Sequence, residues 1–244
     1  MTDSRKAVVS VIAAVVVVGL VVGLVLVFAV IPLPDYGSLA DEPDSSIPGT
    51  VAFARWDDGD LCVWTVPAGG GDAREVLCDN NIGFGEISPG WTPDGMLVVE
   101  QFGPNKEVFR VIDPDTGETL DRISFEQTGA FDGPVGRDFV VTQDGLSVYV
   151  DGDRGSAQLL LESPSGSERV VLEVDGPADY RFDWARLSPD GEWILTQDSE
   201  GRLIVVAVEG DPNARILVDD VDGWMAAAWF IPGFEEGTWD PREA

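Results

Sequence analysis

The chain has 244 residues, enough for one sizeable domain, and it carries 15 Lys+Arg against 44 Asp+Glu, for a net charge of −29. A surface this acidic repels nucleic acid, so we expect no DNA or RNA partner. The sequence has no histidine, which removes the usual general base, the Ser-His-Asp and Cys-His nucleophile systems and the commonest zinc ligand. We therefore expect no metal and no cofactor, while carboxylate-only chemistry stays open.

The first element in chain order is an uncharged run of 25 residues, Ala7–Ile31. At about 1.5 Å per residue, a helix of this length spans roughly 37 Å, enough to cross a hydrocarbon core of roughly 30 Å with some tilt. In hydrocarbon every backbone polar group must bond internally, so a helix is predicted despite the many valines. The pattern predicts a transmembrane signal anchor at residues 7–31.

Charges on the two sides of this run predict its orientation. Arg5 and Lys6 precede it, whereas Asp35, Asp41 and Glu42 follow it. The positive-inside bias places residues 1–6 in the cytoplasm and everything after the helix outside. The predicted location is a single-pass protein of the cell membrane with an extracytoplasmic C-terminal domain.

Two alternatives concern the same segment. Ser38-Leu39-Ala40 resembles a signal-peptidase site, so cleavage after Ala40 is the rival to a retained anchor, although secretory apolar regions are typically only about 7–15 residues. Gly19 and Gly23 form a G-x-x-x-G spacing, which can bring two transmembrane helices close together. A homodimer through these glycines is therefore a possible partner arrangement.

Composition predicts two segments without a core of their own. Residues 32–49 hold four prolines among acidic and small residues, which indicates an extended or disordered linker. Residues 234–244 are predicted to form a disordered acidic tail. Between them, residues 50–233 alternate short apolar runs with Gly, Asp and Pro turns, which is an all-β pattern.

Three turn motifs recur in this domain. They are Trp91-Thr92-Pro93-Asp94-Gly95, Val141-Thr142-Gln143-Asp144-Gly145 and Leu187-Ser188-Pro189-Asp190-Gly191, each followed by an apolar strand. Proline pre-sets φ at the second turn position, aspartate accepts backbone hydrogen bonds and glycine adopts positive φ. The glycines are 50 and 46 residues apart, a spacing typical of four-stranded propeller blades.

The turns divide the domain into groups of predicted strands. One group is 86–91, 96–101, 107–112 and 119–125; the next is 137–142, 146–150, 157–161 and 169–174; the third is 181–187, 193–197, 203–208 and 214–218. The strands 51–55, 61–66 and 74–78 form a fourth blade that the last strand, 224–230, completes. This predicts a β-propeller of about four blades closed by the C-terminal strand; a larger ring made by two chains is the alternative.

The Thr92-Pro93-Asp94-Gly95 and Ser188-Pro189-Asp190-Gly191 turns with their following strands resemble the TolB-type, WD-repeat-like β-propeller repeat. By period the resemblance covers residues 50–234. It implies a non-catalytic propeller used for protein–protein contact at or near the cell envelope. The chain lacks the separate N-terminal globular domain of TolB itself, so the resemblance implies a fold and leaves the partner open.

The two cysteines, Cys62 and Cys78, fall on adjacent strands of the first predicted hairpin. If Val66 pairs with Arg74 across the intervening turn, Cys62 lies directly opposite Cys78. Two cysteines outside the membrane are expected to oxidise, so the spacing predicts a structural disulfide. With two cysteines and no histidine, a metal site is not expected here.

Acidic clusters at residues 57–60, 113–118 and 151–153 coincide with expected hairpin turns, where Asp and Gly are ordinary, and none provides the six to eight oxygens of a calcium loop. We expect a membrane-anchored binding or scaffolding module of the cell envelope that is not an enzyme. Two alternatives remain: a carboxylate-dependent, glycan-active propeller enzyme, and a sensor ectodomain that works through a membrane partner.

Overall fold

The computed structural model describes residues 43–78, 87–102, 106–126, 145–152, 155–210, 214–219, 221, 227–234, 238 and 240–243, all within one compact unit, Tyr36–Ala244. Residues 1–6, the predicted anchor 7–31 with Gly19 and Gly23, and the cleavage position after Ala40 lie outside the described residues. In the described part of the chain, none of the helices is both long enough and apolar enough to span a bilayer.

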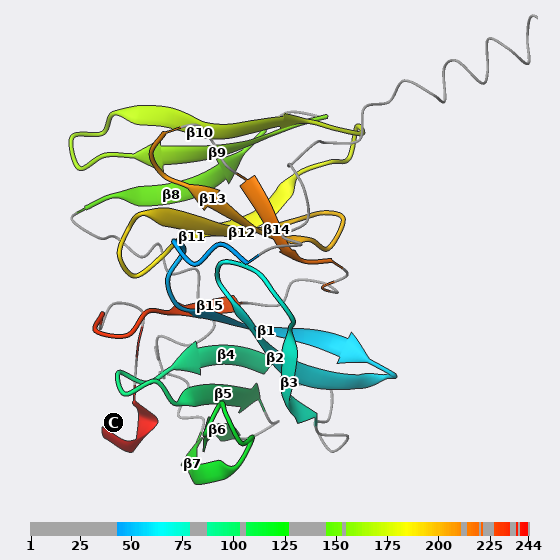
Figure 1. Cartoon of the computed structure of the whole chain (residues 1–244), viewed down its shortest axis with the longest axis vertical. Coiled ribbons are helices and arrows are strands. Elements are labelled where there is room, and N and C mark those ends of the chain that lie inside the picture. Colours follow the sequence, from blue (N-terminus) through cyan, green and yellow to red (C-terminus); the bar gives the residue numbers. More distant parts are fainter. Residues whose placement is uncertain are drawn as a thin grey trace, which may run out of the picture. The chain divides into compact units, whose positions relative to one another are not determined.

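The described residues form an all-β domain of fifteen strands in four antiparallel sheets. The first sheet has the order β15-β1-β2-β3 (Figure 1). Its strands are β1 (Thr50–Asp57), β2 (Asp60–Pro67), β3 (Arg74–Cys78) and β15 (Ala227–Phe230). Val51 pairs with Trp229 and Phe53 with Ala227, so the last strand of the chain completes the sheet of the first, as the sequence predicted.

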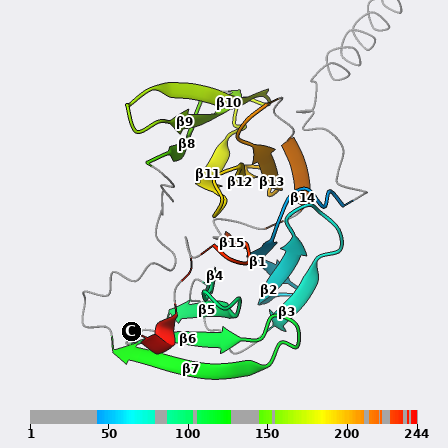
Figure 2. The same cartoon turned by 60° about the vertical axis from the view of Figure 1, so that its left-hand side comes forward.

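The second sheet has the order β4-β5-β6-β7 and is composed of strands that follow one another in the chain (Figure 2). They are β4 (Ile87–Trp91), β5 (Leu97–Phe102), β6 (Lys106–Ile112) and β7 (Thr119–Glu126). Each begins and ends within two residues of its predicted bounds. The apolar runs between the turn motifs were sufficient to place all four.

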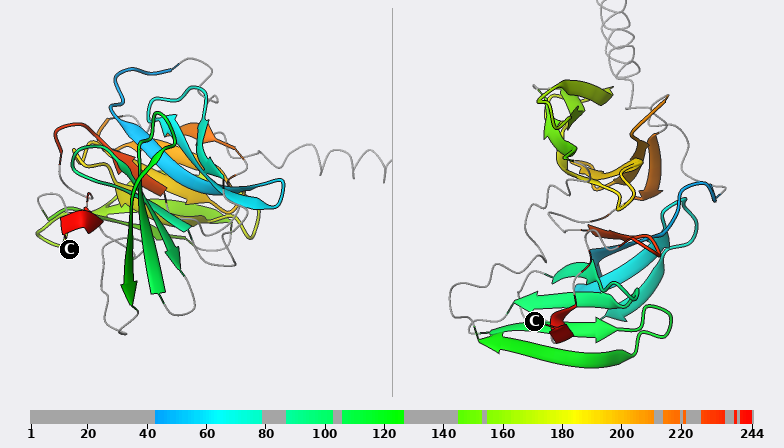
Figure 3. Two further views of the ribbon diagram at one scale, coloured as in Figure 1. Left: turned by 90° about the horizontal axis from the view of Figure 1, so that it is seen from below. Right: turned by 90° about the vertical axis from the view of Figure 1, so that its left-hand side faces the viewer.

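The remaining sheets have the orders β11-β12-β13-β14 and β10-β9-β8 (Figure 3). Their strands are β8 (Ser147–Asp151), β9 (Ser156–Glu162), β10 (Glu168–Asp175), β11 (Phe182–Leu187), β12 (Trp193–Asp198), β13 (Leu203–Ala207) and β14 (Ala214–Val218). The strand predicted at 137–142 lies outside the described residues, so the β8–β10 sheet is described with three strands.

Three apolar clusters join the sheets pairwise, because both faces of the central strands are buried. On β12, Ile194 packs toward β8–β10 and Leu195 toward the β1 sheet. On the β1 sheet, Phe53 packs toward β11–β14 and Ala52 toward β4–β7. Among the described residues, none of the three clusters links β4–β7 to β8–β10. The all-β class is confirmed, while a closed ring of about four blades stays a prediction.

The end of the predicted linker is folded onto the domain, in contrast to the expected extended or disordered spacer. Ile47 is buried in the cluster between the β1 and β11–β14 sheets. The backbone N–H of Asp44 donates to the carbonyl of Gly69 at 2.9 Å, and Trp229 Nε1 donates to the carbonyl of Pro48 at 2.9 Å. One buried apolar residue and two hydrogen bonds thus hold this segment against the domain.

The predicted disordered tail also contains ordered residues. Thr238 forms a parallel bridge with Trp91 on β4, and Pro241–Glu243 form a short 3-10 helix, η1. The Arg242 guanidinium binds Asp240 at 2.5 Å and reaches Asp94 in the β4–β5 turn at 3.4 Å. Composition predicted disorder because the segment is polar; an ion pair and a buried proline hold it in place instead.

Candidate functional site

The first repeat turn, Thr92–Met96, closes the β4–β5 hairpin through its threonine. The Thr92 hydroxyl accepts the backbone N–H of Met96 at 2.8 Å and donates to the Asp94 carboxylate. The N–H of Gly95 donates to the Thr92 carbonyl at 2.9 Å, and Gly95 has φ +82°. Thr92 is fully buried. Thr92, Asp94 and Gly95 therefore each have a role in turn geometry.

The second well-matched turn repeats the same network between β11 and β12. The Ser188 hydroxyl accepts the backbone N–H of Trp193 at 3.0 Å and donates to Asp190. Gly191 donates to the Ser188 carbonyl at 2.9 Å and has φ +72°. Pro189 precedes Asp190 as Pro93 precedes Asp94. In both motifs the buried hydroxyl, rather than the aspartate alone, holds the turn.

The third repeat turn is described only from Gly145 onward, because Asp144 lies outside the described residues. Gly145 has φ +77°, and a Cβ there would lie 2.9 Å from the Pro164 side chain. Pro164 belongs to a further turn of the same type, in which the Ser163 hydroxyl accepts the N–H of Ser167 at 3.1 Å. The Ser-Pro-x-Gly signature of that turn was present in the sequence and was missed because it links β9 and β10 instead of beginning a repeat.

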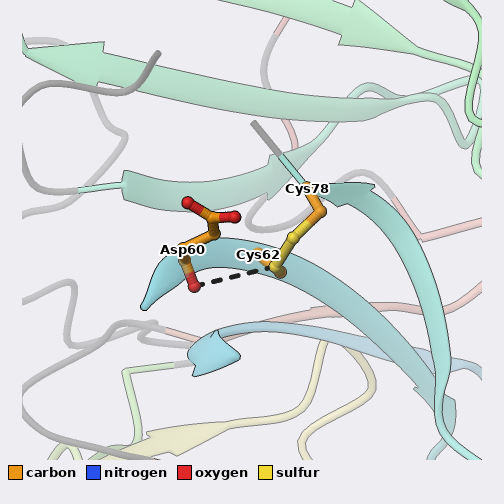
Figure 4. The surroundings of a disulfide bond; sticks show 3 residues. All are labelled: Asp60, Cys62 and Cys78. Atoms are coloured by element: carbon orange, nitrogen blue, oxygen red, sulfur yellow. Dashed lines mark hydrogen bonds between the residues drawn. A yellow bond between two sulfur atoms is a disulfide. The ribbon is translucent and has the colours of Figure 1, made fainter. Parts of the chain in front are cut away.

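The predicted disulfide joins Cys62 on β2 to Cys78 on β3, with a Cα–Cα distance of 4.2 Å (Figure 4). Cys62 Sγ lies 3.7 Å from the backbone oxygen of Asp60. A sulfur in a disulfide carries no proton, so this contact is not a hydrogen bond. Glu75 brings a carboxylate within 4.8 Å of both sulfurs. With the sulfurs bonded to each other, this group offers no thiolate to a metal.

The acidic clusters at 57–60 and 113–118 lie in turns, as predicted, whereas Asp153 of the third cluster lies outside the described residues. Asp58 and Gly59 form the two-residue connection between β1 and β2, both with positive φ, at 49° and 91°. In the β6–β7 turn, the Asp113 carboxylate accepts the N–H of Asp115 at 2.7 Å and of Thr116 at 3.2 Å. The Asp113 carboxylate is thus bound by the backbone of its own turn.

Two buried carboxylates, Asp198 and Glu100, were missed by sequence reasoning. Asp198, at the end of β12, is fully buried and accepts hydrogen bonds from the backbone N–H groups of Glu200 and Arg202 at 3.0 and 2.9 Å. Arg202 Nε donates to it at 2.8 Å, and the Tyr180 hydroxyl at 3.3 Å. The Asp-x-x-Gly-Arg spacing is the signal that could have identified it. These hydrogen bonds to Asp198 stabilise the β12–β13 hairpin.

Most described arginines are committed to contacts within the chain. The ion pairs are Arg74–Asp115, Arg169–Glu209, Arg181–Asp183, Arg202–Asp198, Arg202–Glu200, Arg215–Asp44, Arg242–Asp94 and Arg242–Asp240. Arg186 donates to the carbonyl of Ala227 at 3.1 Å, and Arg55 lies over the Trp64 ring at 3.9 Å. Because the cations are engaged, the charge that remains available to a partner is negative.

The outer face of the β8–β10 sheet is defined here as the face opposite the apolar cluster shared with β11–β14. In the strand register, Tyr149, Leu160 and Val170 lie side by side across the three strands. Val170 is 48% exposed, whereas Leu160 is 8% exposed. A hydrogen bond to Glu168 raises the pKa of Tyr149 to about 12. Since Tyr149 and Glu168 lie on opposite sides of β9, their side chains reach across that strand.

Carboxylates border this apolar row on both sides. Glu162 and Glu168 pair directly on one side, and Asp151 and Glu173 flank Gln158 on the other. Gln158 Nε2 donates to Glu173 at 2.9 Å. In the described strands, no residue on this face is basic. The arrangement suits a ligand that brings an apolar group together with positive charge.

No family model matches the chain, and no curated protein sequence does. Solved structures match at low identity. One from a study of two prolyl endopeptidases is 15% identical, with 72% of this chain and 29% of that chain covered and a TM-score of 0.26. An uncharacterized protein from Listeria monocytogenes EGD-e is 11% identical over 71% of this chain and 51% of its own, with a TM-score of 0.27.

A periplasmic gluconolactonase from Pseudomonas aeruginosa is 18% identical, with 70% of this chain and 53% of that chain covered and a TM-score of 0.24. The chain thus spans between 29% and 53% of the lengths of these three proteins. A likeness at this level concerns the β-rich fold and assigns no activity, substrate or partner. The resemblance to the TolB-type repeat has no matching family model and stays a prediction.

The comparison corrects one expectation. The sequence predicted that the chain is not an enzyme, because the resembling repeat family is non-catalytic and histidine is absent. Prolyl endopeptidase and gluconolactonase are enzymes. The prediction that this chain is not an enzyme is therefore wrong, because its fold does not exclude catalysis. A lack of histidine excludes particular mechanisms and leaves carboxylate chemistry available.

Proposed function

We propose that this chain is a membrane-anchored, extracytoplasmic protein whose propeller-like domain binds a cationic protein partner at the cell envelope. The observation that carries the proposal is the internal use of its arginines, in a chain with a net charge of −29. Such a surface attracts positively charged partners over distances near the Debye length, about 10 Å at 0.1 M salt. The uncharged segment 7–31 would hold the domain near the membrane.

Binding of charged probes tests this proposal. The full chain, in nanodiscs of zwitterionic lipid, is titrated with fluorescent hexalysine and hexaglutamate, with empty nanodiscs as the control. We expect hexalysine to bind and its affinity to fall as salt is raised, because screening weakens exposed charge contacts. Equal binding of the two peptides, or affinity that salt leaves unchanged, would contradict the proposal.

The N-terminus of the mature protein tests the anchor separately. A retained anchor leaves the segment 7–31 in the membrane-bound protein. Mass spectrometry of the purified chain should therefore find the N-terminal residues attached to the domain. A chain that starts at Asp41 would show that the segment is a cleaved signal peptide, and the domain would then be secreted instead of anchored.

A second candidate function is a carboxylate-dependent hydrolase that acts on glycans or sugar lactones. One observation favours it: Ser88 and Glu100 lie directly opposite each other on β4 and β5 and are only 7% and 3% exposed. A buried carboxyl group is the kind of residue that serves as a general acid in glycoside hydrolysis. The pair offers a hydroxyl and a carboxyl group on one sheet face.

A turnover assay on a panel of glycans and sugar lactones tests this candidate. Activity that is lost in Glu100→Gln and kept in Glu192→Gln, an exposed glutamate at the β11–β12 turn, would support it. The melting temperature of each variant shows whether loss of activity reflects unfolding. No turnover by the wild-type chain on any member of the panel would count against the hydrolase.

A further inference from the structure

We infer that the outer face of the β8–β10 sheet is the docking site for a short basic protein segment that carries an apolar side chain. The apolar side chain would cover the row formed by Tyr149, Leu160 and Val170, and its lysines or arginines would contact the carboxylates on both sides. The inference rests on the proposed function and gives that function a location.

The first support is the register of Val170 with Tyr149. Single exposed apolar residues are normal on protein surfaces. Here Val170, 48% exposed, lies in register with the half-buried Tyr149, and the Leu160 side chain between them is buried. At ordinary strand spacing the row spans about 10 Å from β8 to β10. This is wide enough for one extended segment and too narrow for a large permanent interface.

The second support is preorganisation. Glu173 is held in position, because Gln158 and the Ser156 hydroxyl donate to it at 2.9 and 3.3 Å. Side chains that are already ordered lose less entropy when a ligand binds. The Glu173 carboxylate is therefore ordered before a cation binds.

Charge decides between possible occupants. A second copy of this chain that presented the same face would bring carboxylates against carboxylates, which is repulsive. Nucleic acid and anionic lipid are disfavoured for the same reason. A segment with positive charge on both sides of one apolar residue matches Asp151 and Glu173 on one border and Glu162 and Glu168 on the other. We therefore assign the face to a basic protein segment.

The experiment measures binding of a designed peptide to the full chain in zwitterionic nanodiscs. The probe is a fluorescent nonapeptide with one leucine flanked by lysines and spaced by glycines. Matched peptides replace the leucine with serine, or the lysines with glutamates. We expect the lysine–leucine peptide to bind most tightly, and the glutamate peptide not to bind.

Protein variants then locate the site. Val170→Ser should weaken binding of the lysine–leucine peptide about ten-fold, because the apolar contact is lost. Leu120→Ser is the matched control, since Leu120 on β7 is 49% exposed and lies on a different sheet. The double variant Glu162→Gln with Glu168→Gln should weaken binding further and flatten its salt dependence. Its control is Glu118→Gln with Glu192→Gln, at two exposed turn positions.

The outcomes separate this inference from the proposed function. If Val170→Ser and Leu120→Ser bind the peptide equally well while hexalysine still binds in a salt-dependent way, the location is wrong and the function stands. If neither basic peptide binds the wild-type chain, both fail. Equal affinity for the leucine and serine peptides would also overturn the docking site, because charge alone would then explain binding.

Discussion

Asp198 shows how one buried charge organises a hairpin of this fold. It is fully buried and accepts hydrogen bonds from two backbone N–H groups, from Arg202 and from Tyr180. Asp198→Ala removes the buried carboxylate partner of the Arg202 guanidinium, 15% exposed, and leaves it only the more exposed Glu200. Breaking a buried pair in this way costs about 3–5 kcal/mol. Urea unfolding followed by tryptophan fluorescence should show this loss in the free energy of unfolding.

The control for Asp198 is an exposed ion pair. Glu209 pairs with Arg169 at 2.7 Å but is 87% exposed. Exposed pairs contribute little because water competes for both charges. Glu209→Ala should leave the free energy of unfolding almost unchanged. Equal effects of the two substitutions would mean that the Asp198 network is not a determinant of stability.

Asp240 makes the attachment of the C-terminal segment dependent on pH. Hydrogen bonds from Arg242 hold the pKa of Asp240 below its ordinary value. A lowered folded-state pKa means that the charged form stabilises the attachment above the unfolded value of about 3.9. The contribution is lost as the pH falls through the lower, folded value.

NMR shifts of the Thr238 and Arg242 amides between pH 2 and 5 should therefore change with a midpoint below about 3.9. Asp240→Asn cannot titrate, so its shifts should lack this transition. A midpoint at or above the ordinary aspartate value in the wild-type chain would show that Arg242 does not hold Asp240 in solution. Asp240 and Arg242 belong to the same segment, so the test reports on the contact by which Asp240 positions Arg242.

At the scale of the element, the hairpin turns depend on glycine for two separable reasons. Gly95 and Gly59 both have positive φ, at 82° and 91°. A Cβ at Gly95 would lie 2.9 Å from the Phe230 ring, whereas nothing lies within 4 Å at Gly59. Phe230 in turn stacks on Trp91, with ring centroids 5.3 Å apart.

Gly59→Ala should therefore lower the free energy of unfolding by about 1–2 kcal/mol, the backbone penalty alone. Gly95→Ala should lower it further, because an added Cβ would force either the β4–β5 turn or the β15 strand to move. Thermal unfolding of the two variants measures the difference. If Gly59→Ala destabilises the domain as much as Gly95→Ala, the close approach of Phe230 does not contribute to the destabilisation.

The disulfide is a second test at this scale. Cys62 and Cys78 are 16 residues apart, and in the chain-entropy model a cross-link of this size stabilises by about 3 kcal/mol. The double variant Cys62→Ser with Cys78→Ser should lose this amount. Wild-type protein treated with dithiothreitol should lose a similar amount, and the double variant should not respond. A wild-type midpoint that is insensitive to reduction would contradict the prediction.

The β2–β3 pair also shows what a sequence can and cannot predict. Cys62 lies opposite Cys78 as expected. The premise was that Val66 pairs with Arg74, yet Arg74 pairs with Thr65, because the register shifts between Val63 and Trp64. A bulge adds one residue to one strand and leaves no reliable trace in the alternation of apolar residues. The strands were predictable, and the irregularity between them was not.

At the scale of the whole molecule, the acidity predicts a dependence on salt. A net charge of −29 repels itself in the compact state, and this repulsion weakens when ions screen it. Raising NaCl from about 0.05 to about 0.5 M shortens the Debye length to a few ångströms. The melting temperature should rise over this range, and KCl should act equally, because screening depends on ionic strength. A melting temperature that does not change would show that the charges are too far apart to matter.

The domain as a whole was predictable where periodicity determines structure. The spacing of the turn glycines was sufficient to place the strand groups and to match the last strand with the first. The candidate docking face was not predictable, because Tyr149, Leu160 and Val170 come from three strands whose register had to be known. The sequence also did not predict that Ile47 and Thr238 are held against the domain. Isolated residues in polar segments become ordered only by packing on a surface that is already formed.

The pairing of β1 with β15 has a consequence for biosynthesis. The ribosome makes β1 at the start of the domain and β15 close to its end, so the sheet begun earliest is finished last. Until β15 arrives, one edge of β1 has unpaired N–H and C=O groups that a foreign strand can join. Translation that stalls before Ala227 would therefore yield a nascent chain that needs a chaperone. The later hairpins pair strands that are neighbours in sequence, so they can form without β15.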